Sequence, residues 1–147
     1  MGRALNVTTA TELSISMKNY MKIYKSLLDR LKNQHLAIDE IINNTTHHRI
    51  NLRPTPEKWN IHDNIAHLAR YQIIFIDRVN RILNENIIPH FDRYKAENDP
   101  DFESFRAMTD YNLLTSIKEE RLKLIALIFS LSETDLEKSG VHKSSEL

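Results

Sequence analysis

The sequence contains no cysteine, only two glycines and four prolines, and no long apolar run. The absence of cysteine excludes disulfides and thiolate metal sites. So few glycines and prolines disfavour a fold of many strands and tight turns, and the chain is rich in residues that favour long helices. No apolar run approaches the roughly 20 residues of a membrane span, and residues 1–10 lack the apolar stretch of a signal peptide. We therefore expect a soluble, all-helical protein in the cytoplasm.

The sequence also has no excess of one sign of charge, because 20 basic residues balance 20 acidic ones. A net charge of zero argues against a dedicated nucleic-acid surface. The chain of 147 residues, 41% of them hydrophobic, has the size and composition of one domain with one core. The sequence thus predicts a single domain over residues 1–147, with neither nucleic acid nor membrane as a partner.

Three stretches have apolar residues at three- and four-residue steps, as one face of a helix requires. They cover about residues 14–43, 60–84 and 101–131. Asn60 is a good N-cap for the second helix, and Asp99–Pro100 is a typical start for the third. The stripe of the second helix is nearly heptad-like, as in helices that pack almost antiparallel. The sequence therefore predicts a helix bundle.

The connecting segments carry further signals. We expect His47–Trp59 to be irregular, because its two prolines disfavour helical geometry in the residues before them. Asn84–Asp101 is a long irregular connection, and long connections are often functional. Its segment Ile87–Phe91 is too apolar for a free loop and is expected to fold back over the bundle end. Ser132–Asp135 resembles a second helix cap.

Histidine is the one residue class that could build a site, because neutral imidazole binds zinc, nickel and similar ions. His62 and His67 are five residues apart, about 140° around a helix, and cannot easily share an ion. His67 lies at the edge of the apolar stripe, and this position by itself favours a partly buried histidine with one hydrogen bond over a metal ligand. Three others are expected at the surface (His62, His47, His48) and one at the boundary of the apolar face (His35). His90 lies in the folded-back loop and could approach a site, although its spacing does not require it. The sequence also predicts a solvated helix face at three basic residues, Lys118, Arg121 and Lys123.

The segment from Arg53 to Leu68 resembles the signature of the DinB/YfiT-like superfamily, a Pro-x-x-Lys-Trp-Asn turn followed by a helix with Ala-His-Leu. The similarity continues through residues 88–92 and 131–142. It implies an up-down-down-up four-helix bundle, often dimeric, that binds a divalent metal, zinc or nickel, through three histidines. It also implies a metal-dependent hydrolase or thiol transferase acting on a small molecule. His67 matches the metal ligand of the second helix, whereas no catalytic residue is identified.

The sequence departs from that pattern after His142, where the family continues into a fourth helix with His-x-x-x-His and this chain reads on only to Leu147. One histidine cannot hold a catalytic zinc, which needs three protein ligands. We expect a truncated bundle, with the fourth helix missing or supplied by another chain, that self-associates through the apolar groove left open. The alternatives are a non-catalytic interaction module and a plain helical partner-binding protein outside the family.

Overall fold

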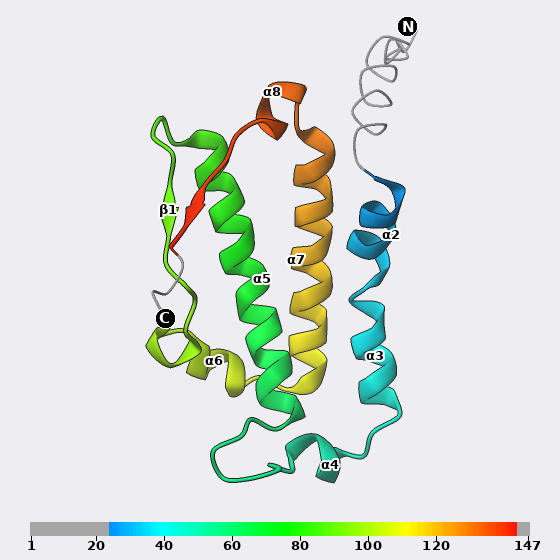
Figure 1. Cartoon of the computed structure of the whole chain (residues 1–147). Helices are drawn as coiled ribbons and strands as arrows, with labels where there is room; N and C mark the ends of the chain where they lie inside the picture. Colours follow the sequence, from blue (N-terminus) through cyan, green and yellow to red (C-terminus); the bar gives the residue numbers. More distant parts are fainter. Residues whose placement is uncertain (1–23, 144–147) are drawn as a thin grey trace, which may run out of the picture.

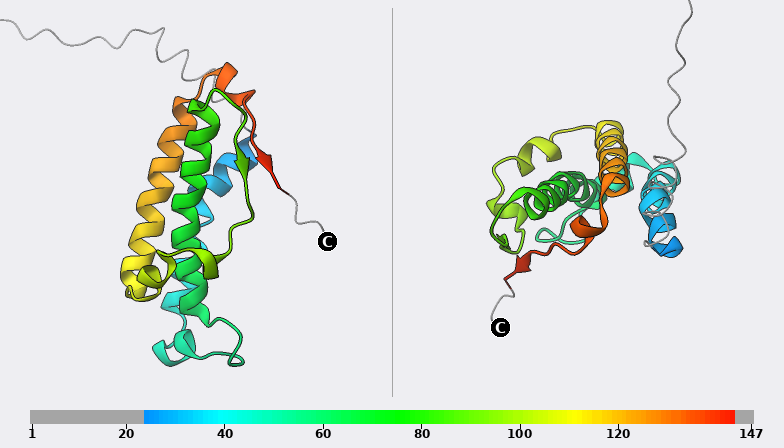
Figure 2. Two further views of the ribbon diagram at one scale, coloured as in Figure 1. Left: turned by 90° about the vertical axis from the view of Figure 1, so that its left-hand side faces the viewer. Right: turned by 90° about the horizontal axis from the view of Figure 1, so that it is seen from above.

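The computed structural model describes residues 24–143 and is mostly helical over that range (Figures 1 and 2). In chain order its elements are α2 (Lys25–Asn33), α3 (Leu36–Asn43), α4 (His47–Asn51), α5 (Ile61–Asn84), β1 (His90–Phe91), η1 (Ala96–Asn98), α6 (Phe102–Arg106), α7 (Asp110–Ser130), α8 (Glu133–Leu136) and β2 (Val141–His142). The successive helices α2 and α3 form one long arm, which lies beside α7, with α5 on the other side of α7 (Figure 2). The expected all-α bundle with three long helical stretches is confirmed.

The core lies where α5, α6 and α7 meet. Ala66 and Ala69 on α5 are fully buried, and these small side chains let the helix approach Leu113 and Ile117 of α7. Phe102 of α6 belongs to the same cluster, and α6 lies beside the lower end of α5 in Figure 1. The expected N-cap of α5 is present, because Oδ1 of Asn60 accepts the backbone N–H of Asp63 at 2.7 Å.

The first long helix is interrupted, which corrects the expectation of one continuous helix from residue 14. At Gln34–His35 the α-helical hydrogen-bond pattern changes. The N–H groups of Ala37 and Ile38 bond to carbonyls three residues back instead of four. The helix ends at Asn43, and residues 14–23 lie outside the described range. The connector after it is not wholly irregular, because the Thr46 side chain caps the short helix α4.

The third long helix begins later than expected. Asp99 lies ten residues before its N-cap, Thr109, and the Asp99 carboxylate accepts hydrogen bonds from Arg70, from Tyr94 and from the backbone N–H of Asp101. A separate short helix, α6, follows, and the chain is extended at Thr109, whose side chain accepts the N–H of Asn112 and starts α7. The capping box predicted at Ser132 is confirmed at the start of α8.

The long crossover runs down the outer side of α5, where β1 pairs in parallel with β2 (Figure 1). The N–H groups of Val141 and Lys143 donate to the carbonyls of Pro89 and Phe91, each at 2.9 Å. Phe91 is buried as expected, but Ile87 and Ile88 stay exposed, so only part of the apolar segment folds back onto the bundle. None of the helices described in residues 24–143 is long and apolar enough to cross a membrane.

Candidate functional site

His67 lies on α5 inside a group of aromatic rings contributed by four parts of the chain. The ring centroids of Trp59, from the turn before α5, and Tyr94, from the crossover, lie 5.2 and 5.3 Å from that of His67. Tyr71, one turn further along α5, stacks at 6.0 Å, and Phe102 of α6 meets the imidazole edge-on at 6.2 Å. The imidazole is therefore held by ring contacts on several sides.

This packing decides the charge state of His67. Burial lowers its pKa from 6.5, because no neighbouring charge compensates for the lost hydration of the protonated ring. Nδ1 is buried and has no hydrogen-bond partner among the described residues, so the single hydrogen bond considered from the sequence is not found there. The ring is thus neutral near pH 7, the form in which imidazole binds a metal ion.

The position of Tyr94 against His67 is fixed by an ion pair behind it. The hydroxyl of Tyr94 donates to Oδ2 of Asp99 at 2.9 Å, and Arg70 donates to both oxygens of that carboxylate, at 2.7 and 3.1 Å. The Arg70 hydrogen bond is the main cause that lowers the pKa of Asp99. Burial, together with Asp99, raises the pKa of Tyr94, so the phenol stays neutral and holds its ring in place.

A complete metal site is not formed by residues 24–143, where no group of three His, Asp or Glu side chains comes together. His67 is one donor without partners, and its Nδ1 lacks the acceptor that usually orients a metal-bound histidine. The described residues therefore fit a divalent ion only in part. The other histidines lie elsewhere: in α4 (His47, His48), at the α2–α3 turn (His35), at the start of α5 (His62) and in the paired strands (His90, His142).

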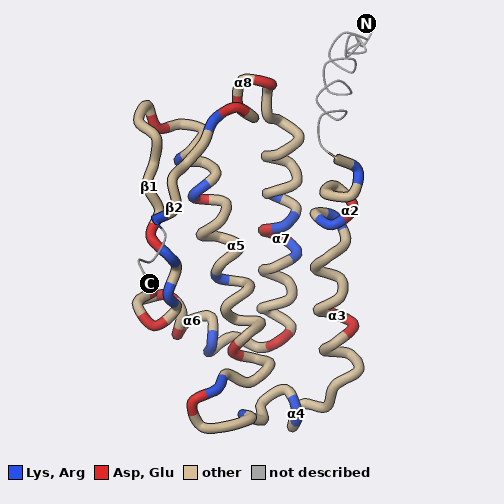
Figure 3. The backbone as a smooth tube through the Cα atoms, in the orientation of Figure 1, with Lys and Arg blue, Asp and Glu red and all other residues tan. Residues whose placement is uncertain are grey.

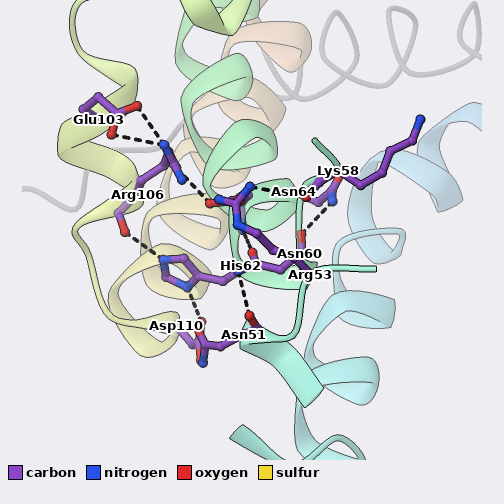
Figure 4. Close-up of polar contacts among 10 residues, drawn as sticks. Asn51, Arg53, Lys58, Asn60, His62, Asn64, Glu103, Arg106 and Asp110 are labelled. Carbon is purple, nitrogen blue, oxygen red and sulfur yellow. Dashed lines mark hydrogen bonds and ion pairs between the residues drawn. The ribbon is translucent and has the colours of Figure 1, made fainter. Parts of the chain in front are cut away.

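His62 is not the solvated residue that the sequence suggested. It is largely buried at the lower end of the bundle (Figure 4), where Nδ1 lies 2.6 Å from Oδ1 of Asp110 and Nε2 lies 2.8 Å from the carbonyl oxygen of Arg106. Both partners are acceptors, so this arrangement favours the protonated imidazole, in which both ring nitrogens donate. Burial lowers the pKa of His62, but these bonds and the charges of Asp110 and Asp63 outweigh it and raise the pKa above 6.5. No signal in the sequence pairs residues 48 positions apart.

Beside His62, Asp63 joins three parts of the chain. Its side chain is almost fully buried, and its two oxygens accept from Arg53 at 2.7 Å and from Arg106 at 2.8 Å. Arg106 also holds Glu103. These contacts tie the turn before α5 and the end of α6 to the first turn of α5 and so fix the position of Trp59 in the aromatic group.

A groove of about 800 Å³ runs between the α2–α3 arm, α5 and α7. Tyr71 lines it and also stacks on His67, so the groove lies next to the aromatic group. Arg121 of α7 points into this groove rather than onto a solvated face, which corrects the sequence-based interpretation. Lys118 and Lys123 on the same helix are exposed, as expected.

Comparison with known proteins agrees with the fold. A family described as the DinB superfamily matches residues 30–146. One similar solved structure is described as "YfiT from Bacillus subtilis is a probable metal-dependent hydrolase with an unusual four-helix bundle topology". It superposes with a TM-score of 0.64 at 12% identity, over 99% of this chain and 77% of that one, and this likeness concerns the fold alone. No curated protein matches. Because the family match spans most of the sequence, the chain belongs to the DinB superfamily.

Proposed function

We propose that this chain is part of a metal-dependent hydrolase or thiol transferase of the DinB type, acting in the cytoplasm on a small molecule. His67 would hold a divalent ion, zinc or nickel. The supporting observation is the neutral imidazole of His67, which has no competing hydrogen bond among the described residues and is held by aromatic rings. A bound ion of this kind would polarise a substrate and activate water or a thiol.

The proposal requires metal ligands in addition to His67. All seven histidines of the sequence lie within residues 24–143, and the structure brings no two of them to His67. A catalytic zinc site uses three protein ligands and one open position. Histidine ligands beyond His67 must therefore come from residues outside this sequence, and the chain alone is expected to be inactive.

Metal analysis tests this proposal. Purified protein is supplemented with Zn²⁺ or Ni²⁺ in imidazole, which can fill the ligand positions that this chain lacks, and is dialysed against the same imidazole buffer. Metal content is then measured for the unaltered chain, for His67→Ala and for His48→Ala, a change at an exposed position of α4. The proposal predicts bound metal that is lost in His67→Ala and kept in His48→Ala. A structural or catalytic site would bind about one ion per chain. A metal content below about one ion per ten chains would therefore reject the proposal.

The groove favours a second candidate, a helical interaction module that self-associates. Leu27, Leu68 and Phe75 line it and are 52%, 47% and 42% exposed, so the bundle leaves apolar surface uncovered on two helices. Such a surface drives association in water. Light scattering over a concentration series tests this candidate: association should weaken in Phe75→Ser and persist in Tyr111→Ser, an exposed position outside the groove. A monomer at every concentration would contradict it.

A further inference from the structure

The crossover between β1 and α6 forms a pocket with the outer side of α5, which we call the crossover pocket. Its volume is about 490 Å³, and its walls are α5 from Arg70 to Arg81 and the crossover over residues 90–100. It shares no lining residue with the groove, and the α5 residues of the two sites point roughly a third of a turn apart around the helix. The crossover pocket is therefore a separate site on another face of α5.

The charged side chains of the crossover pocket are mostly basic. Five are basic and three are acidic: Arg70, Arg78, Arg81, Arg93, Lys95, Asp77, Asp92 and Asp99. In Figure 3, basic residues follow the crossover below β1, beside those of α5. Two of the acids already have a cation, because Asp99 pairs with Arg70 at 2.7 Å. Asp92 pairs with Lys143 at 3.2 Å. The pocket thus holds more positive charge than its own carboxylates neutralise.

Arg78 joins the two walls of the pocket. Its Nη2 donates to the backbone carbonyl of Asp92 at 2.6 Å, and its guanidinium lies 6.0 and 5.4 Å from the ring centroids of Tyr71 and Phe91. Its other N–H groups make no hydrogen bond to the described residues, and none of these residues pairs a carboxylate with it. A guanidinium held by rings and a carbonyl keeps its full charge and has donors left for an anion.

These features select the chemistry of a ligand. Guanidinium groups bind phosphate and carboxylate oxygens through paired, charge-assisted hydrogen bonds, and the excess of positive charge disfavours a metal cation. An inorganic anion would leave most of the volume empty, whereas Ile74, Phe91 and Tyr94 offer apolar walls to an organic group. A nucleic acid needs basic contacts along several phosphates and would also meet the exposed carboxylate of Asp77. A small organic anion fits best.

We propose that the crossover pocket binds a small organic phosphate, whose phosphate group accepts hydrogen bonds from Arg78 and Arg93. Lys95 adds positive charge to the same pocket, whereas Asp77 opposes the anion and limits its affinity. A dianionic phosphate matches this excess of charge better than a single carboxylate does. The site needs no metal, so its test is independent of the function proposed for His67.

Isothermal titration calorimetry of the whole chain at pH 8 tests the proposal, with phenyl phosphate as the probe and benzoate as a carboxylate of similar shape. Phenyl phosphate should bind with a dissociation constant below about 1 mM, at least about tenfold more tightly than benzoate. Because Arg78 also holds the crossover in place, the variants change Arg93 and Asp77, which form no ion pair within residues 24–143.

The two variants should change the affinity in opposite directions. Arg93→Gln removes a donor to the phosphate and should weaken binding about tenfold. Asp77→Asn removes a like charge and should tighten binding about threefold. Arg49→Gln, a matched change at an exposed position of α4, should leave the affinity unchanged.

The proposal is wrong if phenyl phosphate does not bind, if benzoate binds as tightly, or if Arg93→Gln binds like the unaltered chain. A weaker affinity in Asp77→Asn would also contradict it, because damage to the fold loses binding and does not improve it. An equal loss in Arg49→Gln would show a general effect of charge. Tighter binding of a single-stranded oligothymidylate would assign the pocket to nucleic acid instead. The titrations contain no added metal ion, so a negative result leaves the function proposed for His67 in place.

Discussion

Nδ1 of His62 donates a hydrogen bond to Oδ1 of Asp110 over 2.6 Å and thereby ties the first turn of α5 to the first turn of α7. Nε2 of the same ring donates to the carbonyl of Arg106, the last residue of α6. One protonated side chain thus joins three helices at the end of the bundle from which α5 and α7 both start.

The first prediction is a pH dependence of stability that comes from His62. Its folded pKa lies above the unfolded value of 6.5, so its stabilisation is complete below pH 6.5 and is lost as the pH rises through the folded pKa. His62→Gln should lose about 2 kcal/mol of unfolding free energy at pH 6, since bonds to a charged group are strong, and less at higher pH. Urea unfolding between pH 5.5 and 8.5 measures this difference, and a constant gap between the two proteins would contradict it.

The second prediction concerns the buried carboxylate of Asp63. Asp63→Asn leaves Arg53 and Arg106 without their shared anion, and should lower the unfolding free energy by about 3 kcal/mol. The control is Glu85→Gln, which removes the exposed pair with Arg81 and should change the unfolding free energy far less than Asp63→Asn does. A similar loss of unfolding free energy in the two variants would show that the buried Asp63 pairs stabilise the fold no more than an exposed pair does.

The third prediction concerns the close approach at Gly140. A Cβ atom there would lie 2.6 Å from Cε2 of Phe91 and 3.1 Å from Cγ1 of Ile82. Gly140→Ala should therefore push β2 away from β1 and lower stability by about 2 kcal/mol, despite the usual gain from a less flexible unfolded chain. Calorimetry should show a Tm lower by roughly 4–8 °C, with Ser139→Ala as the unaffected control. An unchanged or higher Tm for Gly140→Ala would refute the prediction.

The fourth prediction uses Trp59, the only tryptophan of the sequence, as a reporter on His67. The two rings are 5.2 Å apart, and a protonated imidazole in contact with an indole quenches its fluorescence. Because burial lowers the pKa of His67, the emission should stay constant around neutrality and fall only below pH 6.5. His67→Asn should abolish the drop and His48→Asn should not. A drop centred above pH 6.5 would mean that the ring is not desolvated.

Part of the fold could be read from periodicity and capping because both act within a few residues. The apolar stripe and Asn60 located α5, and Ser132 located the cap of α8. The break of the third helix could not be read in this way. Asp99 lies ahead of the short helix α6, and its carboxylate binds Arg70, 29 residues earlier in the sequence, whereas α7 starts separately with the cap at Thr109.

The candidate site, too, could be predicted only in part from the sequence. The sequence by itself determined the helical bundle, the faces of its helices and His67 as the one candidate ligand, because these follow from local patterns and a motif. Only the tertiary structure decided that His62 is buried and paired, and that Arg121 faces a groove. Burial and charge pairing depend on which residues the fold brings together, and a spacing of three or four residues carries no information about partners tens of positions away.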